Sequence, residues 1–221
     1  MVDNEALKLQ EVARRLDVTD TEALRQLERL SAASLVARQP DGTYRITQYG
    51  KLLLHVSETM NFLLKHKQYF ASHDFSALPY QFIDRLGELS GATFIADTME
   101  SLNRGQRVFI AMEEWGWGMA EGVVPELMGP VMEQKAAKGI KMKFIIPEDK
   151  LPKTPSEAPD IEARGLPSVP AVIAITEKEA LIALRLNDGK MDYATFSGTD
   201  PKFVGWVKDL FTYFWERGKR V

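Results

Sequence analysis

The stretch from Leu9 to Leu35 constrains the fold more than any other feature, because it reads as two amphipathic helices joined by a tight turn. Apolar residues recur at helical spacing in both halves, at Val12, Ala13 and Leu16 and then at Leu24, Leu27 and Leu30. Thr19 and Glu22 form a capping-box pattern, so the second helix is expected to begin near Asp20.

Turning the three leucines of the second helix inward leaves a polar row on its outer side. The residues of this row are Thr21, Arg25 and Arg29, with Glu22 and Gln26 beside it, and Thr21, Arg25, Gln26 and Arg29 are the predicted DNA contacts. Side chains three and four positions apart lie on one face of a helix. The row is therefore predicted to enter the major groove of double-stranded DNA.

The next segment predicts a hairpin. Residues 36–39 and 44–47 read as strands, and Pro40 and Gly42 supply turn chemistry between them. Two helices followed by a hairpin is the element order of a winged helix-turn-helix, in which the hairpin contacts the phosphate backbone. Arg38 and Arg45 are the predicted contacts.

Residues 9–54 resemble the winged helices of archaeal and bacterial transcriptional regulators, mainly through the pattern Tyr44-Arg45-Ile46-Thr47-x-x-Gly50. The Gly-Leu-Val that usually follows the recognition helix appears here within Ala33-Ser34-Leu35-Val36. Such domains normally open with another helix of about a dozen residues. Only Met1–Lys8 are available for it, so the first helix is expected to be short or missing.

The charge of this segment favours DNA binding only through local placement of arginines. Residues 1–56 carry eight basic and eight acidic side chains, and the whole chain has a net charge of −3. Affinity for duplex DNA depends strongly on neutralising phosphates. An interaction or dimerisation module with a degenerate winged helix, without specific DNA binding, is the alternative interpretation.

Residues 48–72 are predicted to form a connecting helix. Apolar residues at Leu53, Val56, Met60 and Leu63 alternate in steps of three and four, which suits pairing with a second copy in a homodimer. Further apolar residues on other faces favour packing against the chain's own second domain instead. The expected domains are a winged helix at 1–56, a connecting helix at 57–74 and a sensor domain at 75–221.

The segment from 75 to 221 predicts an α/β domain with a mixed sheet, so the expected fold class of the chain is α+β. A helix is expected to end at Gly105. A βαβ unit and then three further strands are expected to follow it. The elements are strand 107–112, helix 120–138, strand 140–147, strands 171–176, 180–185 and 192–196, and a helix that starts at Asp200-Pro201 and buries an aromatic stripe.

Residues 176–220 resemble the C-terminal part of the regulatory domain of archaeal regulators related to the filament and methanogenesis regulator family. The resemblance is carried by Asp188-Gly189, Asp192-Tyr193 and the spacing of residues from Asp200 to Trp215. The layout is also similar to the phospholipase-D-like fold of some archaeal sugar-responsive regulators. The resemblance implies a ligand-responsive transcription factor that forms a homodimer.

No enzyme activity, cofactor or metal is expected. Phospholipase-D chemistry needs histidines two residues ahead of lysines, and His55, His66 and His73 do not have that spacing. The chain has no cysteine, which removes thiolate chemistry. The glycines at 116–122 miss the dinucleotide-binding spacing.

Glu113, Trp115 and Trp117 are the predicted ligand-binding residues. They are expected on a glycine-hinged loop that follows a parallel strand, where ligands bind in α/β sheets. Two indoles and a carboxylate can hold a ring or a cation there. The alternative is that the indoles pack into the core or against a partner.

The sequence thus predicts a DNA-binding regulator whose C-terminal domain senses a small molecule, dimerises, or both. A small-molecule-binding protein remains a further alternative. No apolar run is long enough to span a membrane, and residues 1–10 do not resemble a signal peptide, so a cytoplasmic location is expected.

Overall fold

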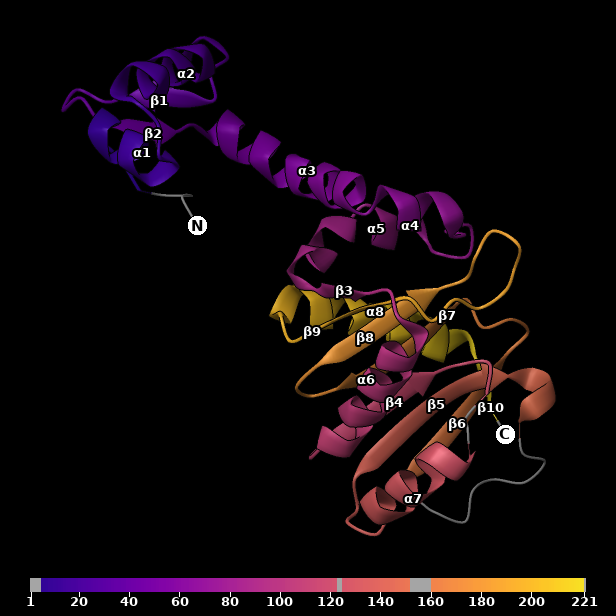
Figure 1. Cartoon of the computed structure of the whole chain (residues 1–221). Coiled ribbons are helices and arrows are strands. Elements are labelled where there is room, and N and C mark those ends of the chain that lie inside the picture. Colours follow the sequence, from indigo (N-terminus) through magenta and orange to yellow (C-terminus); the bar gives the residue numbers. More distant parts are fainter. Residues whose placement is uncertain (1–4, 123–124, 152–159, 221) are drawn as a thin grey trace. The chain divides into compact units, whose positions relative to one another are not determined.

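A computed structural model describes residues 5–122, 125–151 and 160–220, except for the side chains of residues 125–127. The chain forms two compact units, Met1–Asn61 (the N-terminal unit) and Phe62–Val221 (the C-terminal unit) (Figure 1). The expected α+β class is confirmed, because helices accompany a small antiparallel hairpin in the first unit and a large mixed sheet in the second. The expected domain limits at residues 56 and 74 remain a prediction.

The N-terminal unit has the element order of a winged helix. Its elements are α1 (Leu9–Leu16), α2 (Asp20–Ala32), β1 (Val36–Arg38), β2 (Tyr44–Ile46) and the first part of α3 (Gln48–Lys65). The Thr19 hydroxyl accepts a hydrogen bond from the Glu22 amide at 3.2 Å, which satisfies an amide left open at the start of α2. The helix therefore begins where the capping pattern predicts.

The core of this unit is open on one side. Glu5–Lys8 form no helix, and Leu7 instead bridges to Tyr44 through backbone hydrogen bonds of 3.0 and 2.8 Å. The expectation that all three leucines of α2 turn inward is wrong for two of them. Leu27 is buried, but Leu24 and Leu30 are 36% and 39% exposed, because the described part of this unit holds no element that covers them.

The C-terminal unit is built on an eight-stranded sheet of order β10-β6-β5-β4-β7-β8-β9-β3. Strands β4, β5 and β6 are parallel to one another, and the other pairs are antiparallel. Its strands are β3 (Thr93–Ile95), β4 (Trp115–Met119), β5 (Lys141–Pro147), β6 (Ile161–Leu166), β7 (Ala171–Thr176), β8 (Ala180–Leu184), β9 (Thr195–Gly198) and β10 (Lys219–Arg220).

Helices cover both faces of this sheet. They are α4 (Lys67–Ser72), α5 (Tyr80–Ile83), η1 (Leu86–Gly91), α6 (Thr98–Ala111), α7 (Pro125–Ala136), η2 (Glu148–Lys150) and α8 (Pro201–Arg217). One hydrophobic cluster joins α8 to one face, and a second joins α6 and α7 to the other (Figure 1). Because side chains alternate along a strand, β5, β7 and β8 each contribute to both clusters.

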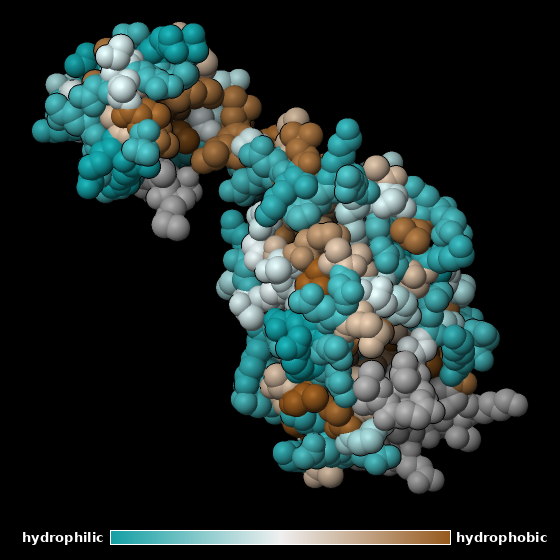
Figure 2. Space-filling model, in the orientation of Figure 1, coloured by the Kyte–Doolittle hydropathy of each residue, from teal (hydrophilic) through white to brown (hydrophobic). Residues whose placement is uncertain are grey.

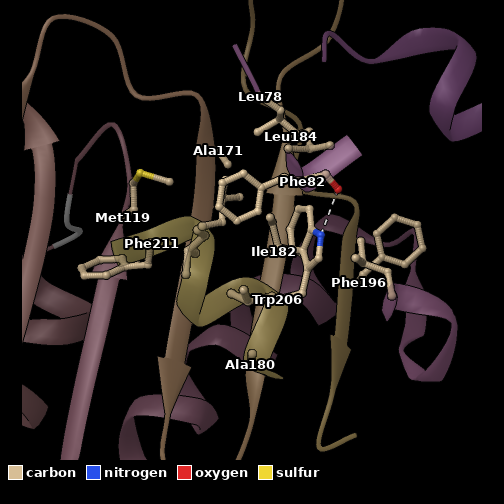
Figure 3. Close-up of a cluster of buried hydrophobic side chains, with 14 of the residues drawn as sticks. Leu78, Phe82, Met119, Ala171, Ala180, Ile182, Leu184, Phe196, Trp206 and Phe211 are labelled. Carbon is tan, nitrogen blue, oxygen red and sulfur yellow. Dashed lines mark hydrogen bonds between the residues drawn. The ribbon is translucent and has the colours of Figure 1, made fainter. Parts of the chain in front are cut away.

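The aromatic stripe of α8 lies in the core, as the sequence predicts. Asp200 caps the helix by accepting from the amides of Lys202 and Phe203 at 3.0 and 3.1 Å. Trp206 is fully buried, and its indole nitrogen donates to the carbonyl of Phe82 at 3.1 Å (Figure 3). That bond satisfies the one polar atom of an otherwise apolar side chain.

The prediction of a strand at residues 107–112 is wrong, because this segment is the end of α6. Val108, Phe109 and Met112 are buried whereas Ile110 is 49% exposed, which is helical spacing and not strand alternation. The Asp97 carboxylate caps α6 by accepting from the Glu100 amide at 2.8 Å. Gly105 accordingly lies inside the helix and does not end it.

The first strand of the predicted βαβ unit is β4, which the sequence assigned to a loop. Gly116 and Gly118 alternate with tryptophans along it. A Cβ atom at Gly116 would lie 2.5 Å from the sulfur of Met112, so a side chain there would require the Met112 side chain, which follows α6, to move. The parallel pairing of β4 with β5 across α7 confirms the βαβ topology with this different first strand.

Other boundaries differ by smaller amounts. The helix expected at 48–72 divides at His66 into α3 and α4. No helix of the described segments is long and apolar enough to cross a membrane.

Candidate functional site

The outward row of α2 is exposed. Thr21, Arg25, Gln26 and Arg29 all lie on the solvent side of the helix, while Ala23 and Leu27 face inward. Arg25 and Arg29 are one helical turn apart, so their guanidinium groups share one face. The structure therefore places these four predicted residues on one surface of the N-terminal unit.

The arginines of this unit fall into two classes. Arg14 and Arg15 on α1 bind Glu11 at 2.7 and 2.9 Å, and Arg15 also binds Glu5 at 2.9 Å. The hydrogen bonds from Arg14 and Arg15 hold the pKa of the Glu11 carboxyl below its usual value. The charges of α1 are thus neutralised within the chain.

The arginines predicted to bind DNA are not neutralised in this way. Arg25, Arg29, Arg38 and Arg45 are exposed and make no ion pair or hydrogen bond among the described residues. The net charge of the segment is zero, and its unpaired arginines lie on α2 and the hairpin, where α2 also carries the exposed carboxylates of Asp20, Glu22 and Glu28. A surface of this kind can bind an anion such as a phosphate group.

The hairpin is short and tightly closed. The Asp41 carboxylate accepts from the Thr43 hydroxyl at 2.7 Å and from the Thr43 amide at 3.0 Å, and these bonds keep the pKa of the Asp41 carboxyl low. Gly42 has φ of 80°, a conformation that glycine adopts without strain. The predicted turn is confirmed.

The structure does not bring the two hairpin arginines together. In the strand register Arg38 lies opposite Tyr44, and Arg45 lies opposite Ala37. Residues directly opposite each other project to the same side, and neighbours along a strand project to opposite sides. Arg38 and Arg45 therefore project from opposite faces of the hairpin.

Glu113, Trp115 and Trp117 do not form a lid. Trp115 and Trp117 belong to β4 and project onto the face of the sheet that α8 covers, where Trp117 stacks on Phe211 at 5.1 Å between ring centroids. Glu113 is exposed and pairs with Lys178 at 2.5 Å. The premise of a glycine-hinged loop after a parallel strand is wrong, because the glycines are part of the strand itself.

The chain's own cations occupy the faces of these indoles. The ammonium group of Lys208 lies 4.9 Å from the ring centroid of Trp115, and that of Lys143 lies 5.1 Å from the centroid of Trp117. These contacts already provide the cation–π pairing that the sequence assigned to a ligand.

The segment that leads into β4 is held by Glu177. Its carboxylate accepts from the amide of Glu113 at 2.9 Å and from those of Glu114 and Trp115 at 3.4 Å. Partial burial acts to raise the pKa of Glu177, but the backbone amides outweigh it and the pKa lies below its usual value. This carboxylate fixes the β7–β8 turn against the start of β4.

An apolar cavity of the C-terminal unit lies on the other face of the sheet. It measures about 160 Å³ and lies among α6, α7 and strands β4, β5, β7 and β8. The sequence interpretation missed it, because it treated Gly105 as the end of a helix. The signal was present in the spacing of Ser101, Gly105, Phe109 and Met112, which share one face of α6.

Histidines and carboxylates form no metal-binding group of three or more among the described residues. His73 is buried, with its Nδ1 2.6 Å from the Tyr69 carbonyl oxygen and its Nε2 3.1 Å from the Asp192 carboxylate. Its ring also stacks on that of Tyr69 at 3.6 Å between centroids. These contacts join α4 to the segment before β9.

Comparison with known proteins gives likeness in structure alone, since no protein-family model and no curated protein matches the sequence. TrmBL2, an archaeal chromatin protein whose structure shows a novel mode of DNA binding, aligns with 98% of this chain and 88% of its own, with 15% identity and a TM-score of 0.50. NucT from Helicobacter pylori covers 59% of this chain and 97% of its own, with 14% identity and a TM-score of 0.45. Nuc from Salmonella typhimurium, a phospholipase D family member, covers 54% and 90%, with 13% identity and a TM-score of 0.40. At these identities the likeness to TrmBL2 shows that the two chains share a fold.

Proposed function

We propose that this protein is a DNA-binding transcriptional regulator that uses the outward row of α2 and one face of the hairpin to contact duplex DNA. The proposal rests on the difference between paired and unpaired arginines in the N-terminal unit. Those of α1 are neutralised by carboxylates, whereas Arg25 and Arg29 on α2 are exposed and unpaired in the described part of the chain.

The shared fold and the sequence resemblance support this proposal. TrmBL2 is an archaeal chromatin protein with a novel mode of DNA binding, and the N-terminal pattern of this chain resembles the winged helices of transcriptional regulators. The proposal extends to the finer assignment, a regulator of the methanogenesis type that acts on chromosomal DNA in the cytoplasm. It includes no catalytic role and no cofactor.

The test compares two double variants in a mobility-shift assay with duplex DNA from upstream of the gene, at about 0.1 M salt. Replacing Arg25 and Arg29 by alanine is expected to weaken binding at least about tenfold, since each specific arginine contact contributes about 1–3 kcal/mol. The matched control replaces Arg14 and Arg15, which are already paired, and is expected to bind within about twofold of the parent. Equal binding by the Arg25/Arg29 variant and the parent would overturn the proposal.

The proposal also includes a ligand-sensing role for the C-terminal unit, with helical residues 48–72 as the segment that carries the response. Shifts of helices are a common way for a sensor to alter the geometry of a regulator. A regulator of this kind is expected to show ligand-dependent DNA affinity.

A second candidate function, a dimerising interaction module, is favoured by the surface of α3. Apolar side chains on this helix are between 40% and 67% exposed at Tyr49, Leu52, Leu53, Leu54, Val56, Met60 and Leu64. Figure 2 shows apolar surface gathered over the first part of α3. Exposed apolar patches of this kind mark protein interfaces. A regulator that forms a homodimer accounts for both the arginines and this surface.

A further inference from the structure

The cavity between α6, α7 and the sheet lies beside a helical position that carries no side chain, Gly105. Ser101, Gly105, Phe109 and Met112 follow one another along the buried face of α6, and the other three are buried. A Cβ atom built at Gly105 would meet no atom within 4 Å, although the residue lies at the centre of this face. A glycine inside a helix also lowers the stability of the helix relative to alanine. An ordinary side chain at position 105 would fill this space and also stabilise α6, and the glycine leaves the space open.

The floor of the cavity is fixed by a second glycine. A Cβ atom at Gly118 on β4 would lie 3.0 Å from the ring of Phe144 and 3.1 Å from that of Phe109. The two rings therefore lie close over the strand, with their centroids 6.0 Å apart, and form an aromatic wall. Met128 and Met132 of α7 also line the cavity, and methionine adapts its shape to an apolar ligand.

The polarity of the lining restricts the ligand. Among the described residues the lining holds no charged side chain and four polar ones, Ser101, Gln106, Tyr193 and Thr195, of which Ser101 and Thr195 satisfy each other through a hydroxyl hydrogen bond of 3.0 Å. An ion buried there would have no partner of opposite charge among the described lining residues. The volume of about 160 Å³ is close to that of an engineered apolar cavity of about 150 Å³ that binds benzene.

We propose that this cavity binds an uncharged, apolar molecule of about the size of one aromatic ring, and that this class of molecule is the effector of the regulator. The effector role rests on the proposed function, whereas the binding site does not. The site lies on the opposite face of the sheet from Trp115 and Trp117, whose ring faces are covered by lysines.

The test uses toluene as the ligand and benzoate as its charged counterpart, with the full chain. Toluene is expected to bind saturably and to shift the methyl NMR signals of Met128 and Met132, but not those of the exposed Met60 and Met99. Benzoate is expected to bind at least about tenfold more weakly, because its carboxylate would be buried without a partner. Absence of toluene binding, shifts confined to Met60 and Met99, or equal binding of benzoate would overturn the site.

Two leucine variants locate the site. Gly105→Leu fills the cavity and is expected to weaken toluene binding at least about tenfold. Gly205→Leu is the matched control, since Gly205 lies inside α8 on its outer side and a Cβ atom there also meets nothing within 4 Å. Toluene binding by Gly105→Leu as tight as that of the parent would overturn the assignment. If Gly105→Leu does not fold, the methyl NMR shifts of Met128 and Met132 in the parent protein determine whether toluene binds in this cavity.

The effector role is measured separately, as the affinity of the parent for its upstream duplex with and without saturating toluene. A change of at least about threefold that Gly105→Leu does not show supports the role, and an unchanged affinity overturns it. A parent that binds toluene but no DNA would contradict the proposed function and leave the site in place.

Discussion

At the junction between α2 and α3, one glycine sets how closely two backbone segments approach. A Cβ atom at Gly50 would lie 2.1 Å from the carbonyl oxygen of Leu35. The Thr47 hydroxyl donates to the Ser34 carbonyl at 2.7 Å and accepts from the Gly50 amide at 2.9 Å. The Thr-x-x-Gly pattern that carries the resemblance to winged helices is thus explained by a cap and a close backbone contact.

Gly50→Ala is therefore expected to destabilise the N-terminal unit by about 1–3 kcal/mol, because the backbone must move to admit the methyl group. Gly205→Ala is the matched control, since it adds the same methyl group to a helix where nothing lies within 4 Å. It is expected to stabilise the C-terminal unit by up to about 1 kcal/mol. Denaturant unfolding followed by circular dichroism measures both, and an unchanged midpoint for Gly50→Ala would contradict this account of the junction.

Glu177 gives the stability of the C-terminal unit a defined dependence on pH. Its pKa is lower in the folded chain, so its contribution is present above the unfolded value of about 4.3 and is lost as the pH falls through the folded value. Glu177→Gln is expected to cost about 1 kcal/mol at pH 7 and to converge with the parent in acid. A difference in unfolding free energy that stays constant between pH 7 and pH 3 would contradict this role.

At the scale of helices and strands, local sequence patterns correctly predicted the positions of elements that are marked by a helix cap or a turn. Thr19, Asp200 and the Pro40–Gly42 turn lie where the sequence places them, because their hydrogen bonds join residues close together in the chain. The outward row of α2 was predictable for the same reason. The exposure of Leu24 and Leu30 was not, because burial depends on which other element covers a helix.

The strand predicted at residues 107–112 is the end of a helix, and the predicted loop after it is strand β4. This error also arose because contacts elsewhere in the chain decide the structure. The apolar run at residues 108–112 fits a buried strand or the inner face of a helix, and the choice depends on contacts made elsewhere. Gly116 and Gly118 read as a hinge in the sequence, whereas the structure uses them to admit Met112, Phe109 and Phe144 against the sheet. The cavity beside Gly105 depended on the same assignment and was missed with it.

The register of the hairpin predicts unequal roles for its two arginines. Arg38 and Arg45 project from opposite faces, so one face of the hairpin can present only one of them to a phosphate. Replacing the contacting arginine by alanine is expected to reduce the salt slope of DNA binding by about 1, and replacing the other to leave it unchanged. Equal reductions for both variants would show that the hairpin does not bind through one face.

At the scale of the whole molecule, the exposed apolar face of α3 predicts self-association. Val56 and Met60 lie four residues apart and are 53% and 60% exposed, and an interface would remove these side chains from water. Light scattering after size exclusion is expected to give a dimer for the parent and a monomer for the double variant Val56→Glu, Met60→Glu. Glu58→Gln, on the same helix, serves as the control. A parent that remains a monomer at about 0.1 mM would contradict the dimer.

The central claim is that the unpaired arginines of α2 bind duplex DNA, and the salt dependence of affinity tests it most directly. Fluorescence anisotropy with labelled duplex at several salt concentrations gives the slope of log affinity against log salt, which is about −0.9 for each phosphate neutralised. The account predicts a slope steeper than about −2 for the parent and markedly weaker binding when Arg25 and Arg29 are replaced by alanine, with Arg14 and Arg15 replacements close to the parent. A parent affinity that does not change with salt, or an Arg25/Arg29 variant that retains the parent's affinity and slope, would contradict it.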